Sequence, residues 1–250
     1  MIADLIPWRI RLAFRSLVTA TAYKEQFGAA DRFLVGIGAG DARTQLIERA
    51  VRGVGPFTFN ARCIEARTVP GTWEQVLRML PKDKIKTLAD IGCGNENPGH
   101  AIERLGISVE YSDIEPFTHI ENFTQMNFNE GIRYPDAKFD YAVSIDVIEH
   151  LENTREFCRE LRRISRLGFI VATPNPLSKR SLRTLRRTGY FEWYGKNELS
   201  WHINPVFHFQ MSTIAEELGM SLEMSGNTCF FKDHNAIDHA EAMIYKFSVV

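Results

Sequence analysis

The chain has 250 residues, of which 44% are hydrophobic, enough to fill the core of one large α/β domain with or without an appendage. Thirty basic and thirty-one acidic residues give a formal net charge of −1, so no overall field recruits nucleic acid or an anionic membrane. Four widely spaced cysteines without a C-x-x-C pair argue against a thiolate zinc site and a disulfide framework, and favour a cytoplasmic location.

Residues 1–72 are predicted to form a helical N-terminal extension. The first stretch, MIADLIPWRIRLAFRSLVTATAY, is interrupted by arginines, so neither a signal peptide nor a membrane span is expected there. Its apolar residues fit one side of an amphipathic helix packed on the main domain, with peripheral membrane contact as the alternative. The later stretch FLVGIGAGDARTQLIERAV has spaced glycines, but no acidic residue directly precedes Gly36, so a turn between helices is predicted.

From residue 86 onward, short apolar runs alternate with helical patterns, which indicates a parallel sheet with crossover helices. The predicted strands are KTLADIG, ISVEYSD, FDYAVSID and GFIVATPN. The predicted helices are HAIERLG, IEHLENTREFCRELRRIS and STIAEELGM. The final run AMIYKFSVV is expected to lie antiparallel beside SLEMSGN. These elements place the chain in the α/β class.

The sequence LADIGCGNENPGH joins a predicted strand to a predicted helix, where backbone N–H groups commonly bind ligands. A dinucleotide loop of the form G-x-G-x-x-G would need glycine at position 97, which is Asn97, and no G-K-[ST] is present for a P-loop. Asp90 stands shortly before Gly92 and Gly94, and its carboxylate would repel a pyrophosphate but attract a cation. S-adenosylmethionine (SAM) carries a sulfonium and an ammonium group, so SAM is the predicted ligand.

This motif resembles the glycine loop of the class I SAM-dependent methyltransferases, and the resemblance covers roughly residues 86–224. It implies a Rossmann-like, doubly wound, seven-stranded sheet that is mostly parallel and has an antiparallel last strand. We therefore expect a methyltransferase domain over residues 73–250, preceded by the helical extension and interrupted by an inserted lid.

The resemblance also implies roles for residues along the predicted sheet. Asp113, at the end of VEYSD, would bind the ribose hydroxyls, and Ile114 would pack on the adenine. Asn127 stands where the family usually has Asp at the adenine edge, and its side-chain oxygen can still accept a hydrogen bond. The full predicted SAM site comprises Asp90, Gly92, Cys93, Gly94, Asp113, Ile114, Asn127, Phe128 and Asp146.

The stretch SIDVIEHLEN follows a central strand, at the sheet edge where α/β enzymes bind ligands. Asp146, Glu149 and His150 have the spacing of a helical first turn, so we expect them to face one point and predict them as catalytic residues. Their D-x-x-E-H pattern resembles the E-x-x-E-H of two metal-dependent O-methyltransferase groups, those of ubiquinone biosynthesis and those acting on the 3′-terminal 2′-hydroxyl of small RNAs. That resemblance implies a divalent ion, with His202 or His208 completing its shell.

Two other roles for this pattern remain open. In the first, His150 acts as a general base without a metal. In the second, the histidine has a structural role, capping a helix or packing in the core. The preferred prediction assigns no metal ligand.

Residues 176–209 are predicted to form a lid, because connections in α/β folds usually have only about 2 to 6 residues. The basic residues between Pro176 and Trp201 are Lys179, Arg180, Arg183, Arg186, Arg187 and Lys196. Aromatic residues lie among them, and such faces stack on sugars or bases while guanidinium groups bind phosphates or carboxylates. The alternative is a helical lid whose aromatic residues pack inward and whose arginines face solvent. The stretch also resembles the lid of bacterial methyltransferases that act on surface polysaccharides or sugar nucleotides, which implies an anionic saccharide acceptor.

The predicted function is SAM-dependent O-methylation of a small-molecule or saccharide acceptor, such as a surface glycan or a sugar phosphate. A metal-dependent RNA 2′-O-methyltransferase is one alternative, disfavoured by the near-zero net charge and by the absence of a separate RNA-binding module. A non-catalytic protein on the same fold is another, because Glu96 stands where the family usually has glycine. The sequence does not indicate an oligomeric state.

Overall fold

The computed structural model describes residues 72–94, 102–103, 105–116, 120–194, 202–227 and 240–250. The strands are β1 (Thr87–Ile91), β2 (Ser108–Asp113), β3 (Phe123–Gln125), β4 (Phe139–Ile145), β5 (Ser165–Pro174), β6 (Met220–Asn227) and β7 (Ala242–Val249). The helices are α4 (Thr72–Met79), α6 (Thr154–Ile164), α7 (Lys179–Thr188) and α8 (His208–Leu218), with 3-10 turns η2 (Lys82–Lys84), η3 (Phe128–Glu130) and η4 (Ile148–His150).

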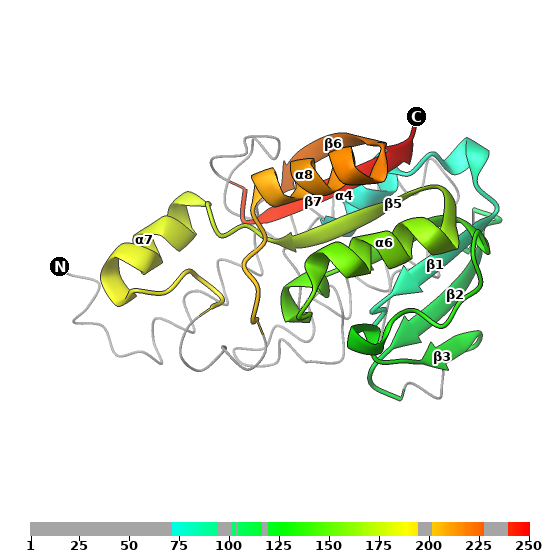
Figure 1. Cartoon of the computed structure of the whole chain (residues 1–250), viewed down its shortest axis with the longest axis horizontal. Helices are drawn as coiled ribbons and strands as arrows, with labels where there is room; N and C mark the ends of the chain where they lie inside the picture. Colours follow the sequence, from blue (N-terminus) through cyan, green and yellow to red (C-terminus); the bar gives the residue numbers. More distant parts are fainter. Residues whose placement is uncertain (1–71, 95–101, 104, 117–119, 195–201, 228–239) are drawn as a thin grey trace.

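The strands form one seven-stranded sheet in the order β3-β2-β1-β4-β5-β7-β6 (Figure 1). Strands β3, β2, β1, β4 and β5 pair in parallel, whereas β7 is antiparallel to both β5 and β6. The predicted α/β fold, with seven mostly parallel strands and an antiparallel last strand, is therefore confirmed.

Strand β4 shows why the sheet is buried on both faces. Its sequence FDYAVSI is buried throughout, as expected of a central parallel strand covered on both sides. Neighbouring β4 side chains enter opposite cores, because Ala142 packs in one hydrophobic cluster while Tyr141 and Val143 pack in the other. The first cluster contains Phe157 of α6, and the second contains Trp73 of α4. Helices thus cover both faces of the sheet, as a doubly wound fold requires (Figure 1).

Two predicted helices differ from the observed ones at their ends. The pattern predicted as one helix over IEHLENTREFCRELRRIS divides into η4 and α6, because Asn153 caps α6 by accepting a hydrogen bond from the Glu156 N–H at 3.0 Å. Helix α8 begins at His208, four residues before the predicted start.

Several expectations lie outside the described residues. These are the helical extension over residues 1–71, the turn around Gly36, and the loop positions Glu96 and Asn97. Among the residues that the structure describes, none of the helices is both long and apolar enough to span a bilayer.

Candidate functional site

The carboxyl ends of β1, β2, β4 and β5 meet at one edge of the sheet, because these strands are parallel. The segments that follow them carry the residues predicted from the sequence. Gly92 follows β1, Asp113 ends β2, and Asp146 follows β4. Two clusters of polar groups result, one around the glycine loop and one around η4.

The first position of the glycine loop accepts only glycine without rearrangement of its neighbours. Gly92 has φ +80°, and a Cβ built there would lie 2.1 Å from Val147 Cγ2. The N–H groups of Gly92 and Cys93 donate to the Ser112 carbonyl at 2.7 and 3.0 Å. Cys93 itself is buried. The loop is therefore held against β2 on one side and against the segment after β4 on the other.

Asp113 connects the loop to the end of β2. Its carboxylate accepts hydrogen bonds from the Gly94 N–H at 2.8 Å and from the Glu115 N–H at 3.1 Å, one on each oxygen. Each carboxylate oxygen has a second lone pair, so both can still accept a hydroxyl donor. The adjacent Ile114 side chain is 56% exposed, which leaves an apolar surface beside this carboxylate.

Asp90 is the most unusual group of this cluster. Its side chain is buried beneath the loop, and in the described part of the chain its Oδ2 has no hydrogen-bond partner. Burial, together with the charge of Asp113, raises the pKa of the Asp90 carboxyl to about 8. A cation beside Asp90 would offset the cost of burying this charge, so the group suits a positively charged ligand.

The predicted adenine-edge residues lie after β3, close to Asp113. The Met126 N–H donates to the Asp113 carbonyl at 2.9 Å, which keeps this segment beside the loop. Asn127 caps η3, since its Oδ1 accepts from the Asn129 N–H at 3.1 Å. Phe128 is buried and packs against Phe157 with ring centroids 6.0 Å apart, so its ring belongs to the core.

The second cluster consists of Glu149, His150 and His202, each of which offers one atom within 4.8 Å of those of the other two. The His150 and His202 rings lie edge to face, with centroids 4.6 Å apart. Glu149 is fully buried, and its Oε2 accepts a hydrogen bond from Thr173 Oγ1 at 3.1 Å. Within the described ranges, Glu149 Oε1 and His202 Nδ1 are buried without a partner.

Burial sets the protonation preferences in this cluster. Burial and the nearby Asp146 raise the pKa of Glu149 above its usual range. Burial, aided by His150, lowers the pKa of His202 to about 4, so this imidazole is neutral near pH 7.

The segment that carries His202 is fastened to η4 by backbone contacts. The N–H groups of Ile203 and Asn204 both donate to the Glu149 carbonyl, at 2.9 and 3.0 Å. The Asn204 side chain donates to the Leu151 carbonyl as well. Asn204 therefore positions His202, although nothing in the sequence singles it out beyond its place in HINPVF.

Asp146 and His208, also predicted for this site, are not members of the grouped set. Asp146 has φ +53° and lies outside η4, so the expected helical turn does not include it, and it is not one of the three grouped residues. Its charge still acts on Glu149. Of the two histidines considered as further ligands, His202 joins the cluster, whereas His208 Nδ1 is hydrogen-bonded to the Tyr245 hydroxyl at 2.6 Å.

Comparison with known proteins gives a family. A family model described as a methyltransferase domain matches residues 66–222. Ajmaline N-methyltransferase from Rauvolfia serpentina is 26% identical over 105 residues. That match covers 36% of this chain and 36% of the relative, so the chain spans little more than a third of the relative's length.

Solved structures share the fold. A SAM-dependent methyltransferase from Archaeoglobus fulgidus has a TM-score of 0.53 and 17% identity over 70% of this chain and 91% of that one. A SAM-dependent methyltransferase from Thermotoga maritima has a TM-score of 0.54 and 14% identity over 82% of this chain and 99% of that one. Because the family model covers more than half of the chain, the protein belongs to the class I SAM-dependent methyltransferases.

Proposed function

We propose that this methyltransferase transfers the methyl group of SAM to a hydroxyl group that binds beside His150 and His202. The observation that carries the proposal is that the segment leading into the second cluster lies against the glycine loop. Val147, which packs against Gly92, lies three residues before His150. A methyl donor held by the glycine loop would therefore have its reactive end near the histidine pair.

The donor side of the proposal rests on complementary charge and exposed surface. Asp90 would bind the ammonium group of SAM, and Asp113 would accept hydrogen bonds from the ribose hydroxyls. Ile114, exposed beside Asp113, would pack on the adenine. To accept a hydrogen bond from the adenine edge, Asn127 Oδ1 would have to share or give up the bond it accepts from the Asn129 N–H.

The acceptor side needs alignment and a place for one proton. The sulfonium already activates the methyl carbon, so the protein mainly positions donor and acceptor for an in-line displacement. As the new C–O bond forms and the C–S bond breaks, the hydroxyl loses its proton, and a neutral imidazole of the pair can accept it. The low pKa of His202 keeps that ring neutral, and His150 lies directly against it.

A divalent ion bound by Glu149, His150 and His202 is a second proposal for the same cluster. One carboxylate and two imidazoles suit a transition-metal ion, and the two buried, unpartnered atoms noted above fit the set. When bound, such an ion would lower the pKa of an acceptor hydroxyl. An RNA 2′-hydroxyl is an acceptor consistent with this alternative.

A saccharide or another small molecule is the proposed acceptor. Aromatic side chains of the lid lie at or near this cluster. The buried Tyr194 packs on His202 with ring centroids 5.3 Å apart, and the half-buried Phe191 packs on Phe207 at 5.9 Å. An accessible ring such as that of Phe191 suits the apolar face of a sugar. The relative named for N-methylation of ajmaline supports a nitrogen acceptor as the alternative. We also propose a cytoplasmic location, which the buried Cys158 thiol, outside any disulfide of the described residues, supports.

Two measurements test the proposed function in order. Calorimetric titration with SAM is expected to show binding by the wild type that Asp113→Ala weakens strongly. Transfer of labelled methyl from SAM to a panel of sugars, phenols, alcohols and amines is then compared for wild type and His150→Ala. Absence of SAM binding would support the non-catalytic alternative, whereas undiminished turnover by His150→Ala would remove that residue from the mechanism.

A further inference from the structure

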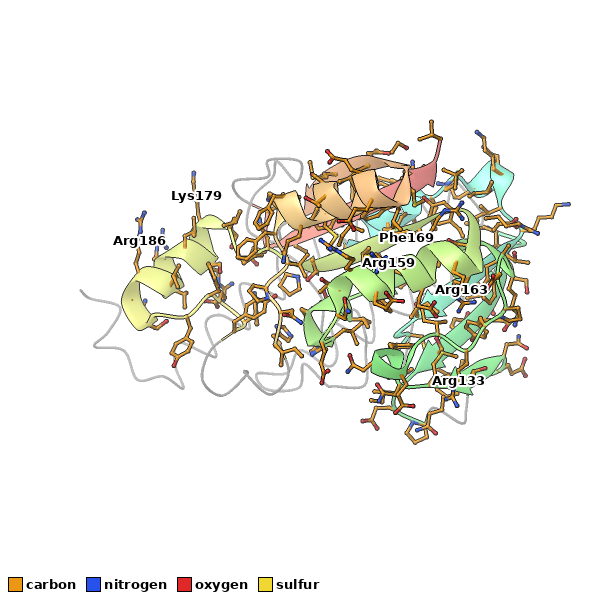
Figure 2. All side chains as sticks on the ribbon, viewed as in Figure 1. Arg133, Arg159, Arg163, Phe169, Lys179 and Arg186 are labelled. Carbon is orange, nitrogen blue, oxygen red and sulfur yellow. The ribbon has the colours of Figure 1, made fainter. Side chains whose placement is uncertain are left out.

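Helix α7 in the lid carries a stripe of cations on its outer face. Lys179, Arg183, Arg186 and Arg187 are all exposed, and we call them the α7 basic stripe. Their spacing places them within roughly 100° around the helix axis. Figure 2 shows Lys179 and Arg186 extending from the same side of α7, away from the sheet. No acidic residue occurs between Pro176 and Tyr190.

The one basic residue of α7 that turns inward is neutralised. Arg180 forms ion pairs with Glu192 at 2.7 Å and with the buried Glu241 at 3.3 Å, and it stacks over the Trp193 ring at 5.5 Å. In contrast, within the described part of the chain Arg183, Arg186 and Arg187 form no ion pair. Arg180 thus contributes to the fold, whereas these three arginines present their charges at the surface.

The stripe is displayed on a well-anchored support. Ser178 caps the start of α7 by accepting from the Ser181 N–H at 3.1 Å, and Gly189 ends the helix in a left-handed conformation. The Arg180 ion pairs fasten the helix to the start of β7 through Glu241. The helix that presents the cations is therefore held in place against the rest of the domain.

We infer that the α7 basic stripe docks the protein on an anionic lipid bilayer. A basic helix face attracts the phosphates of anionic lipids, and apolar residues at its ends can enter the interface. Leu177 and Tyr190, just before and after the helix, are each 39% exposed. These apolar ends favour a bilayer over a nucleic acid, because a bilayer offers an apolar interior for them to enter.

Docking there would also orient the active site. Helix α7 follows β5, whose carboxyl end belongs to the site edge, and Figure 1 shows α7 beyond that end of the sheet. A bilayer bound to the stripe would therefore lie on the site's side of the molecule. The inference does not depend on which acceptor is methylated.

Flotation of the full chain with lipid vesicles tests the inference. The wild type is expected to float with vesicles of phosphatidylcholine mixed with phosphatidylglycerol, and to remain unbound with phosphatidylcholine alone. High salt should release it. The triple variant Arg183→Gln/Arg186→Gln/Arg187→Gln should bind on the order of a hundredfold more weakly, since each basic residue near an anionic bilayer strengthens binding by about fivefold.

A matched control removes the same charge elsewhere. Arg133, Arg155 and Arg159 are exposed and lie outside the lid, so their triple Gln variant should float like the wild type. Figure 2 shows Arg133 and Arg159 far from α7. Circular dichroism of both variants confirms that they are folded. Equal loss of vesicle binding in the two variants overturns the inference. So does a folded wild type that does not float with anionic vesicles, whether or not it binds a single-stranded RNA oligonucleotide. SAM binding measured in parallel keeps this result separate from the proposed function.

Discussion

Asp90 combines full burial, a raised pKa and an oxygen with no partner among the described residues, so its protonation should be linked to SAM binding. Below about pH 8 the free protein holds this carboxyl protonated, whereas the ammonium of SAM favours the ionised form. Binding must then release a proton, and affinity should rise by up to about tenfold per pH unit between pH 6 and pH 7.5. Calorimetry across this range measures it.

Asp83 serves as the control for Asp90, because its side chain is exposed and it precedes β1, at the end of the strand away from the glycine loop. Asp90→Asn should bind SAM weakly with little dependence on pH, whereas Asp83→Asn should behave as the wild type. If wild-type affinity does not change with pH, Asp90 does not contact the ammonium group.

The metal proposal for the η4 cluster can be tested without any acceptor. Calorimetric titration of the wild type with Mn²⁺ or Zn²⁺ should show one site, and Glu149→Gln or His202→Ala should weaken it by at least about tenfold, because each removes one ligand. His208→Ala is the matched control, since this histidine is bonded to Tyr245 instead. Absence of binding, or equal loss in the His208 variant, would leave His150 as a metal-free base.

Among the elements, the glycine loop depends on glycine at position 92. Gly92→Ala should destabilise the fold by about 1 to 3 kcal/mol and weaken SAM binding, because the positive φ and the contact with Val147 both oppose a Cβ. Gly106→Ala shares the backbone cost alone, since φ is +79° there and nothing lies within 4 Å of the added Cβ. Urea unfolding compares the two.

A rescue variant isolates the steric part of that effect. The double variant Gly92→Ala/Val147→Ala should lose less free energy of unfolding than the sum of the losses of the two single variants. Strict additivity would show that the loop and the segment after β4 do not press on each other, which would remove the contact that joins the two halves of the proposed site.

The elements of the sheet could be predicted from the sequence because their burial follows the chain locally. FDYAVSI and TLADI are mainly apolar runs, and both form central strands. The break between η4 and α6 depends on the Asn153 cap, which a helical pattern of apolar residues hides. The glycine loop could likewise be predicted, from the positions of glycines and acidic residues at the strand ends.

Other parts of the site depend on contacts across the chain that no local pattern contains. His202 reaches Glu149 and His150 through the hydrogen bonds of Ile203 and Asn204 to the Glu149 carbonyl. Thr173 adds a partner to the Glu149 carboxylate from β5. The sequence offered two histidines as candidates for this place, and only tertiary packing distinguishes them.

For the molecule as a whole, the buried Asp90 ties stability to pH. Its pKa is raised on folding, so the folded state holds a proton that the unfolded state has lost, and stability falls as pH rises toward about 8. His202, with a lowered pKa, acts in the opposite sense, but its contribution is complete above its unfolded value of 6.5. Between pH 6.5 and 8 the effect of Asp90 should therefore be visible.

Over that interval the free energy of unfolding of the ligand-free protein should fall by up to about 1.4 kcal/mol per pH unit because of Asp90. Asp90→Asn should reduce the slope to the part due to Glu149, whose pKa burial also raises. Saturating SAM should reduce the slope as well, because the ammonium group stabilises the ionised Asp90 carboxylate. Urea unfolding at several pH values, with and without SAM, measures all three cases. A wild-type slope equal to that of Asp90→Asn would show that Asp90 titrates normally in the fold, and SAM recognition would then have to rest on Asp113 and the backbone of the glycine loop.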